Sequence, residues 1–528
     1  IQKFTDLWST VRKSVVQIGI YIIRELLYIL FMKKILFIIP FFLWTCGGGG
    51  TSSPTEPNND DDSNSGTNAV STGGITSLEW NGENINFSWN VSNDQYFERY
   101  EIKEYYNGFK TIFSSNNIND SQFQYPMSKN EFSSDKSFSL LIHNKNGSFV
   151  ESETKTPKLW EIESDIGNTR LREIQKTSDG GFVTFSYDGS WFGADCDPCP
   201  QVIKLDSNLN IESSFNVNNP NGYLDVTNDN GYILGLQANG SNSVLVKTDS
   251  NGNIEWEKNG QELQGSGDHG GSINDVQTDD DGYLFTISRE FGVGKVNLSG
   301  DTVWFYDGFY SNPRTGDRGL SKSIKKINSN TFVAVGHIPY QESDGNDYQT
   351  AYMVIFNENG NIIAEYFEYN ADYFYEIEIL SNGDILVIGS LHHDYSQPYR
   401  NLDHEIGGYV ARFDNQGNML WNYIREESDI MINFRDAIEK DNGNLIIGGH
   451  KLIQSGNSSG NKQAYIVELD SNGNPLFDFI INWSSQNISG RDIIHSIIKD
   501  DDDKPIVVTL RDISQRGFGS LIYKLIDF

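Results

Sequence analysis

The sequence predicts an all-β protein: a seven-bladed β-propeller of four-stranded antiparallel blades, preceded by a small β-sandwich. Two observations predict the propeller. A unit of four short β-type runs and three turn signals, clearest at Ser272–Tyr306, recurs at intervals of roughly 50–60 residues from Arg170 onward, a period typical of propeller blades. The last copy also lacks its fourth strand, and a matching strand precedes the first copy.

Each copy opens with a turn rich in Asp, Asn and Gly. Asn-Gly and Asp-Gly sequences tolerate the positive φ that tight hairpins require. The apolar, β-branched runs that follow, such as FVTFS and ILVIG, are typical of strands buried between neighbouring blades. The seven turns are residues 179–181, 229–231, 280–282, 328–330, 381–383, 441–443 and 500–503.

A second turn occurs further along most copies, and several of these turns precede a tryptophan strand. The clearest are residues 249–253, 357–361, 414–418 and 470–474. With its tryptophan strand, the unit resembles the KxDxxGNxxW repeats of secreted bacterial propellers and, more distantly, the LDxxTGxxxW repeats of quinoprotein propellers. The resemblance implies the fold and leaves activity open.

The final copy ends at its third strand, LIYKLIDF. The missing strand has its counterpart at residues 158–163, KLWEIE, directly before the first copy. We therefore expect this segment to be the outer strand of the last blade. Such pairing closes the ring over residues 158–528 and removes an exposed sheet edge.

Residues 75–157 have a different pattern of alternating strands and turns. Trp89 on the second run, Tyr100 and Ile102 on the third, and the late run FSLLIHNKNG resemble a fibronectin type III sandwich. In that family the tryptophan packs in the core, so the resemblance implies a core position for Trp89. We expect this domain to space the propeller from the membrane.

A basic segment at residues 32–34 is followed by an apolar run at 35–44 and by Leu43-Trp44-Thr45-Cys46-Gly47. The run is short for a transmembrane helix and has the flanks of a signal peptide. The segment resembles the lipobox of bacterial lipoproteins. That resemblance implies a signal peptide at residues 32–45, acylation of Cys46 and anchoring in the cell envelope, at the outer membrane, facing the periplasm or the surface.

Residues 46–74 are rich in Gly, Ser, Asn and Asp, and we expect a flexible tether there. Residues 1–31 precede the expected start at Met32, and the chain opens with isoleucine. We interpret residues 1–31 as translated upstream sequence. The alternative is a membrane helix at residues 15–31, which Arg24 and Glu25 would make costly.

The net charge of −32 disfavours binding to nucleic acid, because such a chain repels phosphate backbones, and it keeps a large β-protein soluble. Besides Cys46, the sequence has Cys196 and Cys199 in a loop of the first blade. A redox CxxC and half of a metal site are alternatives. For an exported protein we expect a local disulfide.

The connections between the second and third strands of blades four to six are long. They are residues 337–350, 391–407 and 450–463, and the connection 307–320 should lie at the same face. Loops on a rigid scaffold concentrate binding residues, and aromatic and arginine side chains are enriched in binding hot spots. The candidate binding residues are Arg314, Arg318, His337, Tyr340, His392, His393, Tyr395, Tyr399, Arg400, His404 and His450. The alternative is that long surface loops merely tolerate insertion.

No catalytic motif stands out, and we expect neither a cofactor nor a metal. The loop histidines lack metal-site spacing, and the DSNGN turns lack the glutamate and flanking helices of an EF-hand. Three hypotheses remain. The propeller is a binding module for a glycan, peptide or protein; it is an enzyme, either a polysaccharide hydrolase or lyase or a quinone-dependent dehydrogenase; or it is a structural scaffold of the envelope.

Overall fold

The computed structural model describes residues 74–526 except 82, 107, 129–135, 158–159, 167–169, 188–200, 218–220, 238–242, 265–270, 289, 309–318, 342–346, 392–406, 428–429, 454–460, 482–491 and 514–516. The described residues form β-strands joined by turns, with one short helix, α2 (Gly260–Gln264). No described helix has both the length and the apolar character needed to cross a membrane. The predictions for Cys46, Cys196, Cys199 and residues 1–73 lie outside the described residues.

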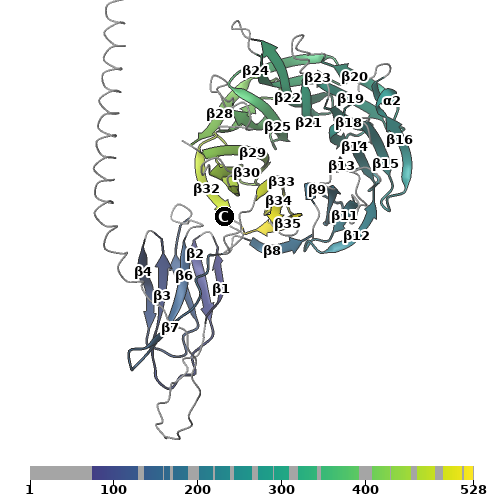
Figure 1. Cartoon of the computed structure of the whole chain (residues 1–528). Coiled ribbons are helices and arrows are strands. Elements are labelled where there is room, and N and C mark those ends of the chain that lie inside the picture. The colour runs from purple at the N-terminus through teal and green to yellow at the C-terminus, as the bar shows by residue number, and fades with distance from the viewer. Residues whose placement is uncertain are drawn as a thin grey trace, which may run out of the picture. The chain divides into compact units, whose positions relative to one another are not determined.

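The N-terminal described part consists of two antiparallel sheets (Figure 1). Trp89 is buried, as expected, and its ring lies 5.6 Å from that of Tyr100 in an edge-to-face arrangement. Ile102 is fully buried beside them. One sheet has the order β1 (Ile75–Trp80), β2 (Asn84–Trp89), β5 (Gln122–Pro126); the other has the order β4 (Phe109–Ser115), β3 (Phe97–Tyr105), β6 (Ser137–Asn144), β7 (Phe149–Glu151).

From Trp160 onward, the described strands form seven four-stranded antiparallel sheets, which confirms the prediction of an all-β repeat protein built from such sheets. Each sheet corresponds to one copy of the sequence repeat. The first three contain β9 (Arg170–Lys176), β10 (Phe182–Tyr187), β11 (Gln201–Leu205) and β12 (Ile211–Asn216); β13 (Asn221–Val226), β14 (Tyr232–Gln237), β15 (Ser243–Thr248) and β16 (Ile254–Asn259); and β17 (Ile273–Thr278), β18 (Gly282–Ile287), β19 (Gly292–Asn297) and β20 (Thr302–Asp307).

The other four sheets follow the same order along the chain, except that the last takes its fourth strand from before the first sheet. They contain β21 (Leu320–Asn328), β22 (Thr331–Gln341), β23 (Asp347–Asn357) and β24 (Ile362–Glu368); β25 (Ala371–Ile379), β26 (Ile385–Leu391), β27 (Gly407–Phe413) and β28 (Met419–Glu426); β29 (Ile430–Glu439), β30 (Leu445–Ile453), β31 (Asn461–Leu469) and β32 (Pro475–Ile481); and β33 (Ile493–Lys499), β34 (Pro505–Ile513), β35 (Gly517–Leu525) and β8 (Trp160–Asp165).

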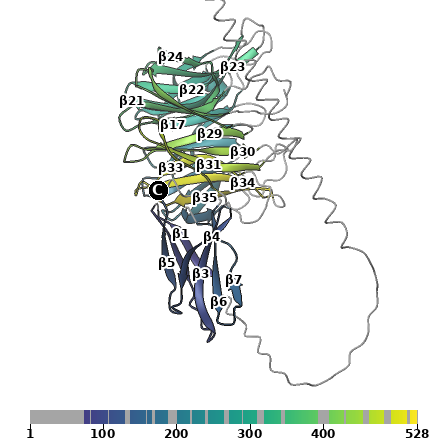
Figure 2. The same ribbon diagram turned by 90° about the vertical axis from the view of Figure 1, so that its left-hand side faces the viewer.

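The first strand of each sheet lies at the centre of a β-propeller ring (Figure 1). We call these the inner strands; they are β9, β13, β17, β21, β25, β29 and β33. Each contacts the next around the ring, and β33 contacts β9. Figure 2 shows the last sheet from the side, with β33, β34 and β35 adjacent. Its fourth strand, β8, pairs with β35, with Trp160 opposite Leu525.

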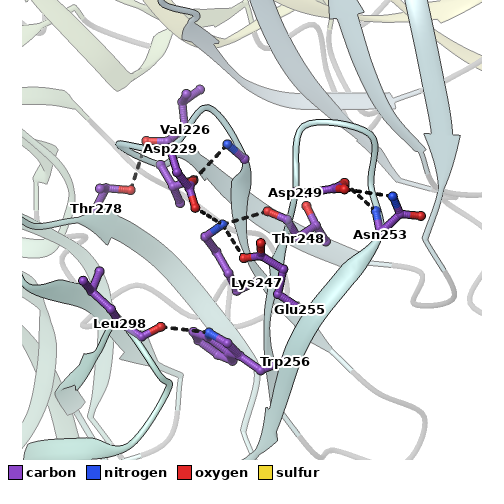
Figure 3. A network of polar contacts seen from close by, with 12 residues as sticks. Val226, Asp229, Lys247, Thr248, Asp249, Asn253, Glu255, Trp256, Thr278 and Leu298 are labelled. Carbon is purple, nitrogen blue, oxygen red and sulfur yellow. Dashed lines mark hydrogen bonds and ion pairs between the residues drawn. The ribbon is translucent and has the colours of Figure 1, made fainter.

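The repeat motif stabilises the sheets (Figure 3). The buried Lys247 of β15 contacts Asp229 in the first turn of its own sheet at 2.9 Å and Glu255 at 2.8 Å. In the second turn, Asp249 accepts N–H hydrogen bonds from Asn251 and Asn253. Equivalent cation–aspartate pairs are Lys204–Asp179, Lys295–Asp279 and Arg412–Asp384. The aspartates of the repeat therefore close turns, as the sequence predicts.

Three tryptophans of the motif, Trp256, Trp304 and Trp421, pack on the next sheet. Trp256 Nε1 donates to the carbonyl of Leu298 at 3.0 Å (Figure 3), and its ring covers Gly300, whose φ is +80°. A Cβ at Gly300 would lie 2.9 Å from that ring. Trp304 covers Gly360 and Trp421 covers Gly473 in the same way. The motif thus couples neighbouring sheets.

Candidate functional site: the central channel

A cavity of about 230 Å³ lies between the inner strands at the centre of the ring. Polar and charged side chains contributed by different inner strands line it. They include Arg172, Tyr223, Asp275, Lys325, Glu376 and His495. Because charged side chains from several rigid strands converge on one cavity, the channel is the candidate site.

β-Bulges place many of these side chains. The pairing of inner strand β25 with β26 shifts between Phe374 and Glu376, and that of β29 with β30 shifts between Phe434 and Asp436. A bulge leaves an extra residue unpaired and re-aims its neighbours. The extra residues are Asn274, Lys322, Tyr375, Arg435 and His495, each followed in the sequence by a carboxylate or a serine.

The carboxylates after the bulges connect one sheet to the next. Asp275 Oδ2 accepts the backbone N–H of Ile324 at 2.8 Å, and Asp436 Oδ2 accepts that of Ile497 at 2.7 Å. Glu173, in the equivalent position, accepts the N–H of Leu224, and Asp225, further along its inner strand, accepts the N–H of Thr278 at 2.6 Å. Since an inner strand has no β-partner on its channel side, these carboxylates satisfy donors that would otherwise lack one.

Burial disfavours the charged form of these carboxylates. It raises the pKa of Asp275 to about 7, although Lys325 opposes the shift, and it raises the pKa of Glu378 to about 7. It also raises the pKa of Asp436 well above its usual range. For Lys325, burial lowers the pKa, but Asp275 and Glu376 raise it more, so the lysine stays protonated.

The channel has a different character toward the starts of the inner strands. Arg172 donates to the hydroxyl of Tyr223 at 2.5 Å, and its guanidinium lies 4.8 Å from the tyrosine ring. The guanidinium of Arg435 lies 4.3 Å from the ring of Tyr375. Because the strands are antiparallel, the connections between second and third strands leave at this end. We call it the loop-bearing end.

Two predicted site residues lie in strands rather than loops. His337 is in β22 and His450 in β30, both buried. Burial lowers the pKa of His337 to about 3 and that of His450 well below its usual range. Tyr340 also lies in β22, opposite Tyr348 of β23. Among the described side chains that line the channel, His337 and His450 do not appear.

The predicted loop boundaries 337–350 and 450–463 are therefore wrong. Strands β22 and β23 stay paired as far as Gln341 opposite Asp347, and β30 and β31 stay paired as far as Ile453 opposite Asn461. The flanking β-branched and aromatic residues extend both hairpins. The candidates Arg314, Arg318, His392, His393, Tyr395, Tyr399, Arg400 and His404 lie outside the described residues.

Sequence reasoning missed the channel residues. Their signal is a pair of adjacent polar residues that interrupts the alternation of apolar and polar residues in an inner strand, as in Arg172-Glu173, Asn274-Asp275 and Arg435-Asp436. Such pairs recur at similar distances before the first turn of several copies. In the described part of the chain, no group of three or more His, Cys, Asp or Glu side chains is arranged to hold a metal ion.

Comparisons with known proteins do not identify a function. No protein-family model and no curated protein matches the chain. Among solved structures, BamB from Moraxella catarrhalis is 12% identical with a TM-score of 0.39, covering 69% of this chain and 99% of its own.

Two further structures are similarly distant. Sqt1 from Chaetomium thermophilum, bound to the N-terminus of the ribosomal protein L10, is 10% identical with a TM-score of 0.40, covering 69% of this chain and 99% of its own. A protein of unknown function from Dyadobacter fermentans is 8% identical with a TM-score of 0.38, covering 69% and 98%. These values are too low to transfer a partner or an activity.

Proposed function

We propose that this chain is a lipoprotein of the bacterial cell envelope, anchored through Cys46, whose seven-bladed propeller binds a protein or peptide partner at its loop-bearing end. A fibronectin type III-like sandwich at residues 75–157 spaces the ring from the membrane. The observation that carries the binding role is the pair of arginine–tyrosine contacts, Arg172 with Tyr223 and Arg435 with Tyr375, at one end of the channel.

Arginine and tyrosine are the residue types that dominate protein-binding hot spots. Each stacked pair is held in place on rigid inner strands, so little side-chain entropy is lost when a partner binds. The acidic side chains Glu378 and Glu439 lie toward the other end of the channel, near the first turns. The two ends therefore offer different chemistry, and the arginine–tyrosine end suits a protein surface.

The hairpins at the loop-bearing end also differ between sheets. Pairing of second and third strands ends at Gln237 opposite Ser243 in the second sheet. In the last sheet it continues to Ile513 opposite Gly517, and β22–β23 and β30–β31 are similarly long. The hairpins of the fourth, sixth and last sheets therefore extend further from the loop-bearing end than the hairpin of the second sheet. An asymmetric rim of this kind favours one orientation of a partner.

The binding role is tested by site-specific photo-crosslinking in cells of the source bacterium. A photoreactive phenylalanine analogue replaces Tyr375 in one variant and Asp441, in a first turn at the opposite end, in a matched control. We expect a discrete crosslinked partner from position 375 and none from 441. Equal crosslinking from both positions would contradict the assignment of the loop-bearing end.

The identified partner then allows a quantitative test. Arg435→Ala should weaken its binding by at least about tenfold, since hot-spot truncations typically cost 2 kcal/mol or more. Asp441→Ala should leave binding unchanged. Anchoring is tested separately: an alkyne-labelled fatty acid should label the wild-type chain and not Cys46→Ser.

A glycan-processing enzyme is the second candidate, favoured by the raised pKa values of Asp275 and Glu378 in one cavity. Asp275, however, is engaged with the N–H of Ile324 and the hydroxyl of Ser323. Release of reducing ends from a panel of acidic and neutral polysaccharides, abolished in Glu378→Gln, would support the enzyme. If no polysaccharide releases reducing ends, the enzyme hypothesis is contradicted, and the role that remains for Asp275 is to connect neighbouring sheets.

A further inference from the structure

Three polar side chains, two of them buried and one half-buried, come together between the sixth and seventh sheets at the loop-bearing end. They are Asn433 of β29, His450 of β30 and His495 of β33. Asn433 and His450 are each 1% exposed and stand opposite each other in the β29–β30 pairing, so they share one face of the sheet. On the same face, Ile438 and Ile446 pack in one cluster with Ile494 and Ile497 of β33.

These side chains hold buried polar atoms with no partner among the described residues. They are Oδ1 and Nδ2 of Asn433, Nδ1 of His450 and Nε2 of His495. A buried polar atom without a hydrogen bond costs about 1–3 kcal/mol, so native proteins rarely leave several in one place. Their concentration at one seam indicates a group that supplies the missing hydrogen bonds.

The charge around these atoms identifies that group's sign. Burial and then the positive charges of Arg435, Arg172, Lys462 and Arg170 lower the pKa of His495 to about 3. Lys462 and Arg435 act on His450 in the same direction. Four cations thus act on His495 and two of them also act on His450, in a chain whose net charge is −32. A cation would be repelled here, and an anion attracted.

The type of donor and the size of the cavity indicate which class of anion fits. A neutral imidazole, a carboxamide and a guanidinium each present N–H donors, and guanidinium groups match the oxygens of carboxylate and phosphate. Arg172 and His495 both line the channel cavity, whose volume of about 230 Å³ admits a small molecule from the channel. A group with several oxygens, such as phosphate or a small polycarboxylate, fits these donors.

We propose that Asn433, His450, His495, Arg435 and Lys462 form a binding site for a small multivalent oxyanion. The site opens on the loop-bearing end of the channel through His495 and Arg172. It goes beyond the proposed partner-binding role, because a free anion occupies it without any partner protein.

Isothermal titration calorimetry of the full chain with inorganic phosphate, with citrate and with chloride, at constant ionic strength, tests the site. We expect saturable binding of phosphate or citrate and none of chloride. Tighter binding of phosphate would indicate a phosphate ligand, and tighter binding of citrate would indicate a carboxylate ligand. Absence of saturable binding by both, or equal binding of chloride, would overturn the proposal.

Variants locate the site. Arg435→Gln and Lys462→Gln should each lower the affinity for the anion by about tenfold or more. This is the usual contribution of a hydrogen bond to a charged group. Lys258→Gln, which removes a cation on the outer strand β16, is the matched control and should bind as the wild type does. Equal affinity for all three variants would place the anion elsewhere.

Crystals soaked in selenate give an independent reading that does not depend on the variants folding. The anomalous signal of selenium should appear within hydrogen-bond distance of His495 Nε2 and Asn433 Nδ2. Selenate density confined to exposed lysines would contradict the site.

Discussion

Lys247 shows how single residues of the repeat hold two turns of one sheet together. Its side chain is 2% exposed, and its ammonium group contacts Asp229, Glu255 and the carbonyl of Thr248. Burial alone would lower the pKa of Lys247. The hydrogen bonds to Glu255 and Asp229 raise this pKa by more, so the lysine keeps its charge. The interaction explains why a lysine recurs two residues before the second turn, without any catalytic role.

Replacing this lysine should destabilise the fold. Lys247→Met leaves the charges of Asp229 and Glu255 without their partner, and we expect a loss of about 1–3 kcal/mol in the free energy of unfolding. Lys258→Met, which removes a looser contact to Asp301 at 3.5 Å, should change it by less than about 0.5 kcal/mol. Urea denaturation measures both, and equal losses would count against a special role for Lys247.

The channel carboxylates should give a distinct pH dependence. The pKa of Asp275 is about 7 in the fold and near 3.9 in an unfolded chain. Its contribution to stability is therefore full below about pH 4 and is lost as the pH rises through about 7. Asp275→Asn keeps an acceptor for Ile324, so its stability relative to the wild type should increase by a few kcal/mol between about pH 4.5 and pH 8.

The control for this measurement is Asp441→Asn. Lys499 lowers the pKa of the exposed Asp441, so that carboxylate titrates below the tested range. The stability difference between this variant and the wild type should stay constant from about pH 4.5 to pH 8. Parallel pH curves for Asp275→Asn and the wild type would show that Asp275 is not buried as described.

The site was less predictable than the fold, for a physical reason. Channel residues such as Glu173 and Asp436 belong to inner strands, whose mixed polar and apolar sequences give a weaker local signal than the apolar second strands. Their proximity arises only when inner strands from distant copies meet around one axis. The sequence predicts loops that begin at His337 and His450, whereas the pairing between strands continues beyond both residues.

At the scale of elements, the second turn of the second, third, fourth and sixth sheets forms one unit with the aromatic strand of the preceding sheet. Phe215 covers Gly252, as Trp256 covers Gly300. Both glycines have positive φ, and both lack room for a Cβ. The glycine in the motif is therefore required twice, by the turn and by the neighbouring ring.

A pair of glycine substitutions separates these two requirements. Gly383 has φ of +85° with no atom within 4 Å of an added Cβ, so Gly383→Ala should cost only the backbone strain of about 1 kcal/mol. Gly300→Ala adds the clash with Trp256 and should cost about 1–3 kcal/mol more. Thermal denaturation of both variants measures these losses of stability. Equal losses would show that the side chain of Trp256 moves aside without cost.

At the scale of the whole molecule, the ring depends on two segments from distant parts of the chain. Strand β8 supplies the outer strand to β33–β35, and the ring of Trp160 lies 5.2 Å from that of Tyr523 in an edge-to-face arrangement. Contacts between β33 and β9 join the same two regions at the centre. Weakening β8 should therefore loosen one sheet before the others.

Trp160→Ala tests this expectation by hydrogen exchange read out by mass spectrometry. Amides of β35 should exchange at least about tenfold faster, because the edge strand that protects them is weakened, while those of β23 keep their wild-type rates. Trp304→Ala is the control: it removes the ring that covers Gly360 and should affect the fourth sheet and not β35. Uniform acceleration throughout the ring would contradict local opening at β8.

The four-stranded sheets followed from the sequence because each copy carries its own turn chemistry. Asp249 and Asn253, for example, close the second turn through contacts within five residues, so the signal is local. The partnership of Trp160 with the last sheet was also expected, from a strand missing at one end and present at the other. Loop lengths were less predictable, since pairing beyond the turn depends on the partner strand.

The β8–β35 pairing also has a consequence for biosynthesis. A ribosome makes β8 before any other strand of the ring and β35 last, so β8 waits unpaired while six sheets form. During that time its edge is open to the β35 of a second chain that has not yet paired its own β8, and such an exchange would link two copies through identical contacts. The order of synthesis therefore makes slow release or crowding on polysomes a source of strand-swapped dimers.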